Sequence, residues 1–110
     1  MSETQQSVSA WADAVFGAVG SNARVAARAN EEMAELMRAL TSDDSHEKAA
    51  EEVADIVIIL YRLASRLGVD LHAEIDRKMA INRTRVWSPD NTGHGYHVRD
   101  RTPTRGGREG

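Results

Sequence analysis

The segment EEVADIVIILYRLASRL (residues 51–67) decides the fold. Apolar residues recur along it at the spacing of one helix face, and two isoleucines widen that face until the segment is apolar nearly all round. We therefore expect a helix from about residue 46 to residue 67 that is the most buried element of an all-α protein. The residues that carry this pattern are Val53, Ile56, Val57, Ile58, Ile59, Leu60, Leu63 and Leu67.

Two more helices are predicted before this segment. Residues 8–16 repeat apolar side chains at helical spacing, and Gly17 ends that helix. A second apolar stripe covers residues 25–40, with Ser21 or Asn22 as its cap. The polar stretch TSDDS then predicts a short turn, in which Asp44 with Glu47 three residues later fits a capping box. The second and third helices should therefore form an antiparallel hairpin.

The helical bundle is expected to end near residue 87. Gly68 is a natural helix stop, and Asp70 is a natural cap for a fourth helix that must end before Pro89. We predict a domain over residues 1–87 and a Gly/Pro/Arg-rich extension over residues 88–110, flexible at least beyond about residue 98. The apolar residues of the fourth helix are Leu71, Ile75, Met79 and Val86.

Composition excludes several classes of protein. The chain has 110 residues and no cysteine, so disulfides, thiolate zinc sites and thiol nucleophiles are excluded. The net charge is -3 without a basic stripe, which argues against a nucleic-acid partner. No apolar run is long enough to span a membrane, and no secretory signal is visible, so a cytoplasmic location is expected. Only 41% of residues are hydrophobic, and this small core favours completion by a second subunit.

Two acidic clusters lie at matching heights on the predicted hairpin. In EEMAE (residues 31–35), Glu32 and Glu35 are three residues apart, as are Glu52 and Asp55 in the following helix. Because both helices rise equally per residue, positions whose numbers add to 87 lie level across the turn. Glu32 then faces Asp55, and Glu35 faces Glu52. We expect these four carboxylates to converge.

Convergent carboxylates favour a bound cation. Four like charges beside an apolar run repel one another, and a hard divalent ion offsets that cost. Oxygen-only ligands suit Mg²⁺, with Mn²⁺ as a substitute, and Mg²⁺ commonly shares its shell with phosphates. A solvated acidic face is the alternative interpretation. Asp55 argues against it, because no basic residue lies three or four positions away to neutralise it.

A basic face and two histidines follow in the sequence. Lys78, Asn82 and Arg85 recur at the spacing of one helix face. Alone, this face favours a solvated helix end, whereas beside a carboxylate cluster it favours phosphate binding. His94 and His97 lie in a glycine-rich stretch, where metal binding is disfavoured against a segment that folds over a neighbouring subunit.

The motifs together resemble those of the MazG-like all-α nucleoside triphosphate pyrophosphatases. EEMAE, EEVAD, a Gly-Val-Asp-Leu turn and a Lys-x-x-x-Asn-x-x-Arg helix carry the resemblance over roughly residues 22–87. It implies a bundle completed in a homodimer or homotetramer. It further implies that Glu31 orients or deprotonates the attacking water, or that it only contacts the residues that bind the metal. The implied Mg²⁺ ligands are Glu32, Glu35, Glu52 and Asp55, and the implied phosphate-binding residues are Lys78, Asn82 and Arg85.

The implied reaction is hydrolysis of a (deoxy)nucleoside triphosphate to the monophosphate and pyrophosphate, in nucleotide-pool house-cleaning. Trp11 and Phe16 are candidate base contacts, with core anchoring as the alternative; base preference cannot be read from the sequence. The role of Glu51 also stays open. A catalytically idle metal- or nucleotide-binding regulator, or a helical interaction module of the same fold, is the alternative function.

Overall fold

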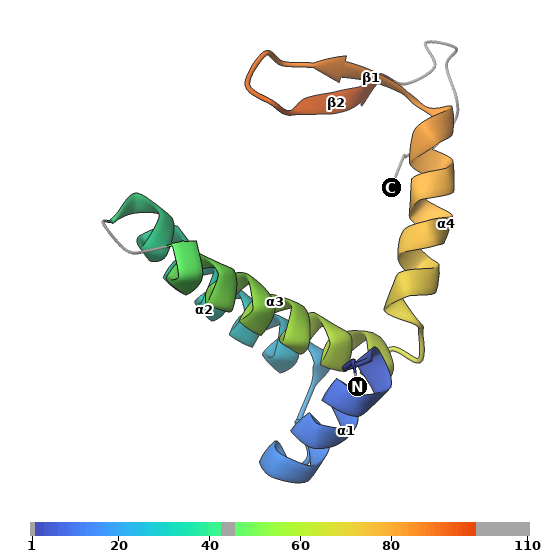
Figure 1. Ribbon diagram of the computed structural model, residues 1–110. Coiled ribbons are helices and arrows are strands. Elements are labelled where there is room, and N and C mark those ends of the chain that lie inside the picture. Colours follow the sequence, from blue (N-terminus) through green and yellow to red (C-terminus); the bar gives the residue numbers. More distant parts are fainter. Residues whose placement is uncertain (1, 43–45, 99–110) are drawn as a thin grey trace. The chain divides into compact units, whose positions relative to one another are not determined.

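The computed structural model describes residues 2–42 and 46–98 (Figure 1). The expected helical architecture is confirmed, with a short β-hairpin in addition. The chain divides into two units, residues 1–74 and 75–110, which are described separately below. The elements in chain order are α1 (Gln5–Phe16), α2 (Asn22–Thr41), α3 (His46–Arg66), α4 (Leu71–Thr84), β1 (Val86–Pro89) and β2 (Gly95–Val98).

Local signals in the sequence set most helix ends. Ser21 caps α2 by accepting a hydrogen bond from the Arg24 amide, at 3.2 Å. Gly68 ends α3 in the left-handed region, with φ of 76°, and the next amide bonds back to the helix. Asp70 caps α4 through a 3.0 Å bond from the Ala73 amide. The predicted capping box at Asp44 lies outside the described residues.

In the first unit, α3 packs against both α2 and α1. The residues of α2 that point inward recur every three or four positions, and those of α3 follow the same spacing. Each inward face contains one glutamate among its apolar residues. The buried and half-buried positions are Val25, Ala29, Glu32, Leu36 and Ala39 in α2, and Ala49, Glu52, Ile56, Ile59, Tyr61, Arg62, Leu63 and Ala64 in α3.

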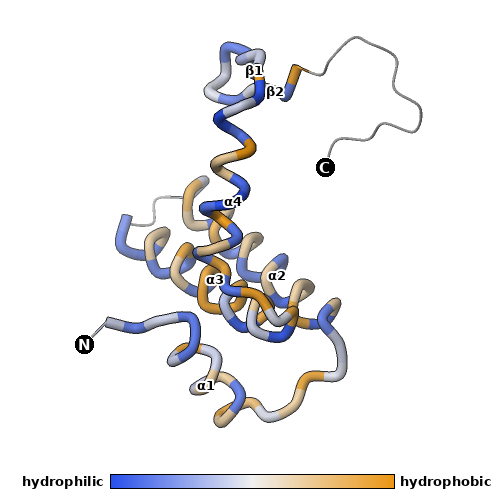
Figure 2. The backbone as a smooth tube through the Cα atoms, turned by 90° about the vertical axis from the view of Figure 1, so that its right-hand side faces the viewer, coloured by the Kyte–Doolittle hydropathy of each residue, from blue (hydrophilic) through white to orange (hydrophobic). Residues whose placement is uncertain are grey.

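The hydrophobic core of the single chain is small. Among the described residues, the buried apolar side chains are Ala12, Val25, Ala39, Ile56 and Ala64. As expected, α3 is the most buried of the described elements, but α1 and α2 cover only part of its apolar circumference. Figure 2 shows apolar positions recurring along both α2 and α3. An outer stripe stays 37–61% exposed and comprises Met33, Met37, Leu40, Val53, Val57 and Leu60.

Gln5 fastens α1 to the junction that follows α3. Its side-chain oxygen accepts a hydrogen bond from the Leu71 amide at 2.7 Å. Its side-chain nitrogen donates to the Val69 carbonyl at 2.8 Å and to the Ser65 hydroxyl at 3.1 Å. One side chain thus satisfies backbone groups at the end of α3 and the start of α4. No helix in the described ranges is both long and apolar enough to cross a membrane.

The second unit contains a hairpin that the sequence analysis did not predict. The fourth helix ends at Thr84, and Val86, expected in that helix, begins β1 instead. The strands are antiparallel, with Trp87 opposite His97. Asp90 organises the loop between them, since its carboxylate accepts bonds from the amide and hydroxyl of Thr92. These bonds hold the pKa of Asp90 below its ordinary value.

We predict that Gly68→Ala lowers the free energy of unfolding by about 1 kcal/mol, measured by urea denaturation. A Cβ at this position meets open space, so the cost arises from the left-handed backbone alone. Gly20→Ala is the matched control, because Gly20 lacks a positive φ and its Cβ would make only an ordinary contact with Arg24. An equal loss in both variants would contradict this account of the α3 terminus.

Candidate functional site

Three carboxylates meet between α2 and α3. Glu32, Glu52 and Asp55 each offer one oxygen, and these oxygens lie within 4.8 Å of one another. The convergence follows from the antiparallel pairing of the two helices, which brings Glu32 level with Asp55 as expected. Glu35 and Glu31 are not members of this group.

Two members of the group occupy positions where a core side chain would otherwise stand. The side chain of Glu52 is 8% exposed and that of Glu32 is 12% exposed. Oε2 of Glu52 is buried and has no hydrogen-bond partner among the residues that the structure describes. Such an orphaned carboxylate oxygen is costly unless something else satisfies it. Asp55 is exposed, so the group opens to solvent on that side. This donor set fits a hard divalent cation.

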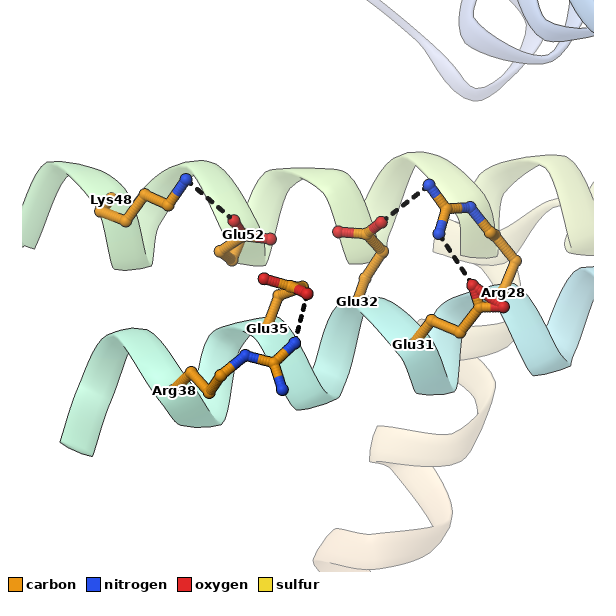
Figure 3. Close-up of polar contacts among 7 residues, drawn as sticks. All are labelled: Arg28, Glu31, Glu32, Glu35, Arg38, Lys48 and Glu52. Atoms are coloured by element: carbon orange, nitrogen blue, oxygen red, sulfur yellow. Dashed lines mark hydrogen bonds and ion pairs between the residues drawn. The ribbon is translucent and has the colours of Figure 1, made fainter. Parts of the chain in front are cut away.

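Basic side chains within the same helices pair with the glutamates (Figure 3). Arg28 contacts Glu32 at 3.0 Å, and Lys48 contacts Glu52 at 3.6 Å. Asp55 was expected to have no cation within its helix, and it forms no ion pair with any described residue. The sequence signal for these ion pairs, which was missed, is a basic residue four positions before each glutamate: Arg28 before Glu32 and Lys48 before Glu52.

Glu35 and Glu31 line a depression beside the three-carboxylate group. Glu35 forms an ion pair with Arg38, and Figure 3 shows its side chain directed from α2 toward α3. Glu31 is exposed and pairs with Arg28 at 3.0 Å. The depression is lined by Arg28, Glu31, Glu32, Ala34, Glu35, Arg38 and Glu52. Of the four acids that the sequence selected as ligands, Glu32, Glu35 and Glu52 line this depression. Asp55 joins Glu32 and Glu52 in the tight group, which does not include Glu35.

The electrostatics of the group perturb Glu32. Burial and a hydrogen bond with the Glu52 carboxyl raise the pKa of Glu32 above its ordinary value. The Asp55 carboxylate adds to this rise, and the Arg28 guanidinium opposes it. The Glu52 and Asp55 carboxyls and the Arg28 guanidinium thus act on Glu32 in opposite directions.

An apolar cavity of about 440 Å³ adjoins the acids. Trp11 and Phe16 line it, with their rings edge to face at a centroid distance of 5.5 Å. Both are more than half exposed, so they are not core anchors of the single chain. The full lining comprises Trp11, Ala12, Phe16, Val19, Arg24, Val25, Arg28, Glu32, Asp55, Ile58, Ile59 and Arg62. Aromatic rings and carboxylates thus border one space.

Arg62 is a residue of this cavity that the sequence analysis missed. Its guanidinium bonds to Asp13 at 3.1 Å and to the Gly17 carbonyl at 2.6 Å. It also lies over the Phe16 ring, 6.0 Å from the centroid. Arg62 thereby holds the end of α1 that carries the aromatic pair. The sequence signal for Arg62 was a basic residue between Tyr61 and Leu63, inside an apolar helix.

The predicted phosphate-binding residues lie in the second unit. Lys78 and Asn82 are on α4, whereas Arg85 lies one residue beyond its end and does not share the helix as expected. The Asn82 carbonyl accepts a 2.8 Å hydrogen bond from the Trp87 indole, and Asn82 Oδ1 is buried without a partner among the described residues. His97 belongs to the hairpin and faces Trp87, with ring centroids 5.7 Å apart.

A model of the MazG-like family matches residues 30–97 of the chain. A protein of cyanophage S-2L named dATP/dGTP diphosphohydrolase is 41% identical over 68 residues, which are 62% of this chain. A protein of Salmonella phage PMBT28 with the same name is 33% identical over 102 residues, 91% of this chain. The chain spans 60% and 32% of the length of these two relatives.

A solved structure also resembles this one. It is the cyanophage S-2L MazG-like pyrophosphohydrolase bound to dGDP and three catalytic Mn²⁺ ions per active site. The TM-score is 0.72 at 33% sequence identity, over 87% of this chain and 90% of the other.

We predict that the raised pKa of Glu32 makes stability pH-dependent when a chelator removes divalent ions. Above the ordinary pKa of 4.5, the folded carboxyl still binds a proton that the unfolded one has lost. The free energy of unfolding should therefore fall as the pH rises through this range, and Glu32→Gln should remove that contribution. Urea denaturation from about pH 4.5 to about pH 7 measures it.

The matched control is Glu51→Gln, which changes an exposed glutamate of α3 outside the group. It should keep the pH dependence of the unaltered protein. If Glu32→Gln and Glu51→Gln give the same profile, the three carboxylates do not interact as described.

Proposed function

The chain belongs to the MazG-like family, and we propose that it is a divalent-cation-dependent pyrophosphohydrolase of deoxynucleoside triphosphates. The observation that carries the proposal is the shared space between buried carboxylates and an aromatic-lined cavity. A nucleotide has the same two halves, an apolar base and a polyphosphate that binds metal. The products would be the nucleoside monophosphate and pyrophosphate.

The proposed metal ligands are Glu32, Glu35, Glu52 and Asp55, holding Mg²⁺ or Mn²⁺. The unpartnered Oε2 of Glu52 supports this assignment, because a cation would satisfy it. The Mn²⁺ ions of the similar phage enzyme agree with it. Glu35 joins the proposed set because it lines the same depression as Glu32 and Glu52, although Arg38 now pairs with it. Bound divalent ions would supply charge neutralisation at the phosphates and a bound water of lowered pKa.

Glu31 is the proposed base that orients or deprotonates the attacking water. It lies next to Glu32 in the chain but outside the tight group, and its exposed side chain is accessible to water. Its ion pair with Arg28 fixes the carboxylate at the border of the acidic depression. A carboxylate that is not itself a metal ligand is available to accept a hydrogen bond or a proton from the attacking water.

Trp11 and Phe16 are proposed to stack on the base. Their exposed rings in the cavity favour a flat aromatic ligand. Because both named relatives are dATP/dGTP diphosphohydrolases, purine deoxynucleoside triphosphates are the proposed substrates. Lys78, Asn82 and Arg85 are proposed to bind the phosphates, as the family resemblance implies.

We also propose that a second copy of the chain covers the outer stripe of α2 and α3, giving a homodimer or a tetramer of two such dimers. The six large apolar residues of this stripe remain exposed, whereas the buried core is mostly alanine and valine. A stripe of this kind is costly to leave in water. The enzyme would act in the cytoplasm on the free nucleotide pool, as a house-cleaning activity.

The test incubates the full chain with each deoxynucleoside and ribonucleoside triphosphate and Mg²⁺ or Mn²⁺, then separates the products. Monophosphate with pyrophosphate from dATP or dGTP is the expected result. Release of inorganic phosphate alone would overturn the proposed cleavage. Absence of turnover together with nucleotide binding would instead favour the idle regulator.

Variants of the acids locate the reaction. Glu52→Gln and Asp55→Asn should each lower kcat/KM by more than about 100-fold, because each removes a charged ligand. Glu51→Gln, in the same EEVAD block but exposed, should retain activity within about threefold. Equal losses in all three variants would contradict the assignment.

Met37→Glu should dissociate the proposed oligomer, because it places a charge in the middle of the outer stripe. Light scattering coupled to size-exclusion chromatography measures the mass. Ala27→Glu is the control, since Ala27 is exposed on the same helix but outside that stripe. An unaltered chain that is already monomeric would refute the proposed interface.

A further inference from the structure

Arg28 lies where the two spaces of the site meet. It lines both the aromatic cavity and the acidic depression, and Glu32 is the only other described residue that does so. Its neighbours on α2 do not share this position. Arg24 lines only the aromatic cavity, and Arg38 lines only the acidic depression.

The guanidinium of Arg28 already binds two oxyanions as a fork. One terminal nitrogen contacts Glu31 and the other contacts Glu32, each at 3.0 Å (Figure 3). The side chain is nevertheless 59% exposed, so a ligand can reach it. An arginine has five N–H donors in a plane, and two ion pairs do not use all of them. Planar forks of this kind suit carboxylate and phosphate alike.

A nucleotide that spans the site must pass this junction. If its base occupies the cavity and its terminal phosphates lie at the carboxylates, the phosphate nearest the sugar lies between them. On the basis of the function proposed above, we infer that Arg28 is a substrate-binding residue that donates hydrogen bonds to this first phosphate. Its positive charge also offsets the repulsion between an incoming phosphate and the acids.

The contacts of Arg28 explain how its guanidinium becomes free to bind a phosphate. A cation at Glu32 competes with Arg28 for the same carboxylate oxygens, because both are attracted by the same charge. Arg28 can then exchange a carboxylate partner for a phosphate partner of the same geometry. The residue therefore links occupation of the acids to capture of the nucleotide.

The test measures equilibrium binding of dGMP, a product that cannot be hydrolysed further at this bond, to the full chain with Mg²⁺ by calorimetry. Arg28→Met should weaken dGMP binding about 10- to 100-fold, the usual effect of losing charged hydrogen bonds. Arg28→Lys should restore part of the affinity through its point charge. Binding of deoxyguanosine, which lacks the phosphate, should change less than about twofold.

Arg66→Met is the matched control, since it removes an exposed arginine that lines neither the aromatic cavity nor the acidic depression. It should change the dGMP affinity less than about threefold. Titration of Mg²⁺ without nucleotide should give an affinity in Arg28→Met that is no weaker than in the unaltered protein. Circular dichroism verifies that each variant is folded.

Four outcomes would overturn the inference. They are no binding of dGMP by the unaltered protein, an unchanged dGMP affinity in Arg28→Met, an equal loss in Arg66→Met, and a loss of Mg²⁺ affinity that accounts for the effect. These outcomes are separate from failure of the proposed function. Turnover of dGTP with dGMP affinity unchanged in Arg28→Met would refute the role of Arg28 alone. A phosphate-dependent loss in Arg28→Met without any turnover in the unaltered protein would refute the hydrolysis and support the contact.

Discussion

The structure depends on the packing of α2 against α3 with a glutamate in each packed face. Glu32 and Glu52 stand at positions where the helical repeat requires apolar side chains, and both are nearly buried. The packing therefore brings the acids together, and the acids in turn weaken the packing, because charge in a core is costly. A bundle arranged in this way gives up stability where the carboxylates of the described helices converge.

The helical part of the fold could be predicted because its signals are local. Ser21, Gly68 and Asp70 cap or end helices through bonds to their own neighbours, so no tertiary information is needed. Burial could not be predicted in the same way. An apolar residue such as Met37 satisfies the helical repeat whether it faces α3 or water, and only the packed arrangement distinguishes the two. The hairpin escaped prediction because its strands have four residues each and include Pro89 and Gly95.

The candidate site was accessible to sequence reasoning to the extent that it follows from counting. Residue spacing and the antiparallel turn place Glu32 level with Asp55, and no side-chain detail is required. The pairing of Arg28 with Glu32 could have been inferred from their spacing of four residues. The contacts of Arg62 could not, because they depend on where a long flexible side chain ends. Arg62 reaches α1 from α3, and nothing in the sequence relates it to Asp13. Basic side chains that position a site from another helix are thus harder to recognise in the sequence than its acidic residues.

The pairing of arginine and lysine with the acids has a consequence for the proposed metal binding. The acids have counterions within their own helices, namely Arg28, Arg38 and Lys48. These glutamates are therefore not left as uncompensated negative charges at the solvent. Uptake of a divalent ion would then be an ion exchange within the protein, in which side-chain cations give way to the metal. Such an exchange favours ions of high charge density over monovalent ones and keeps binding reversible.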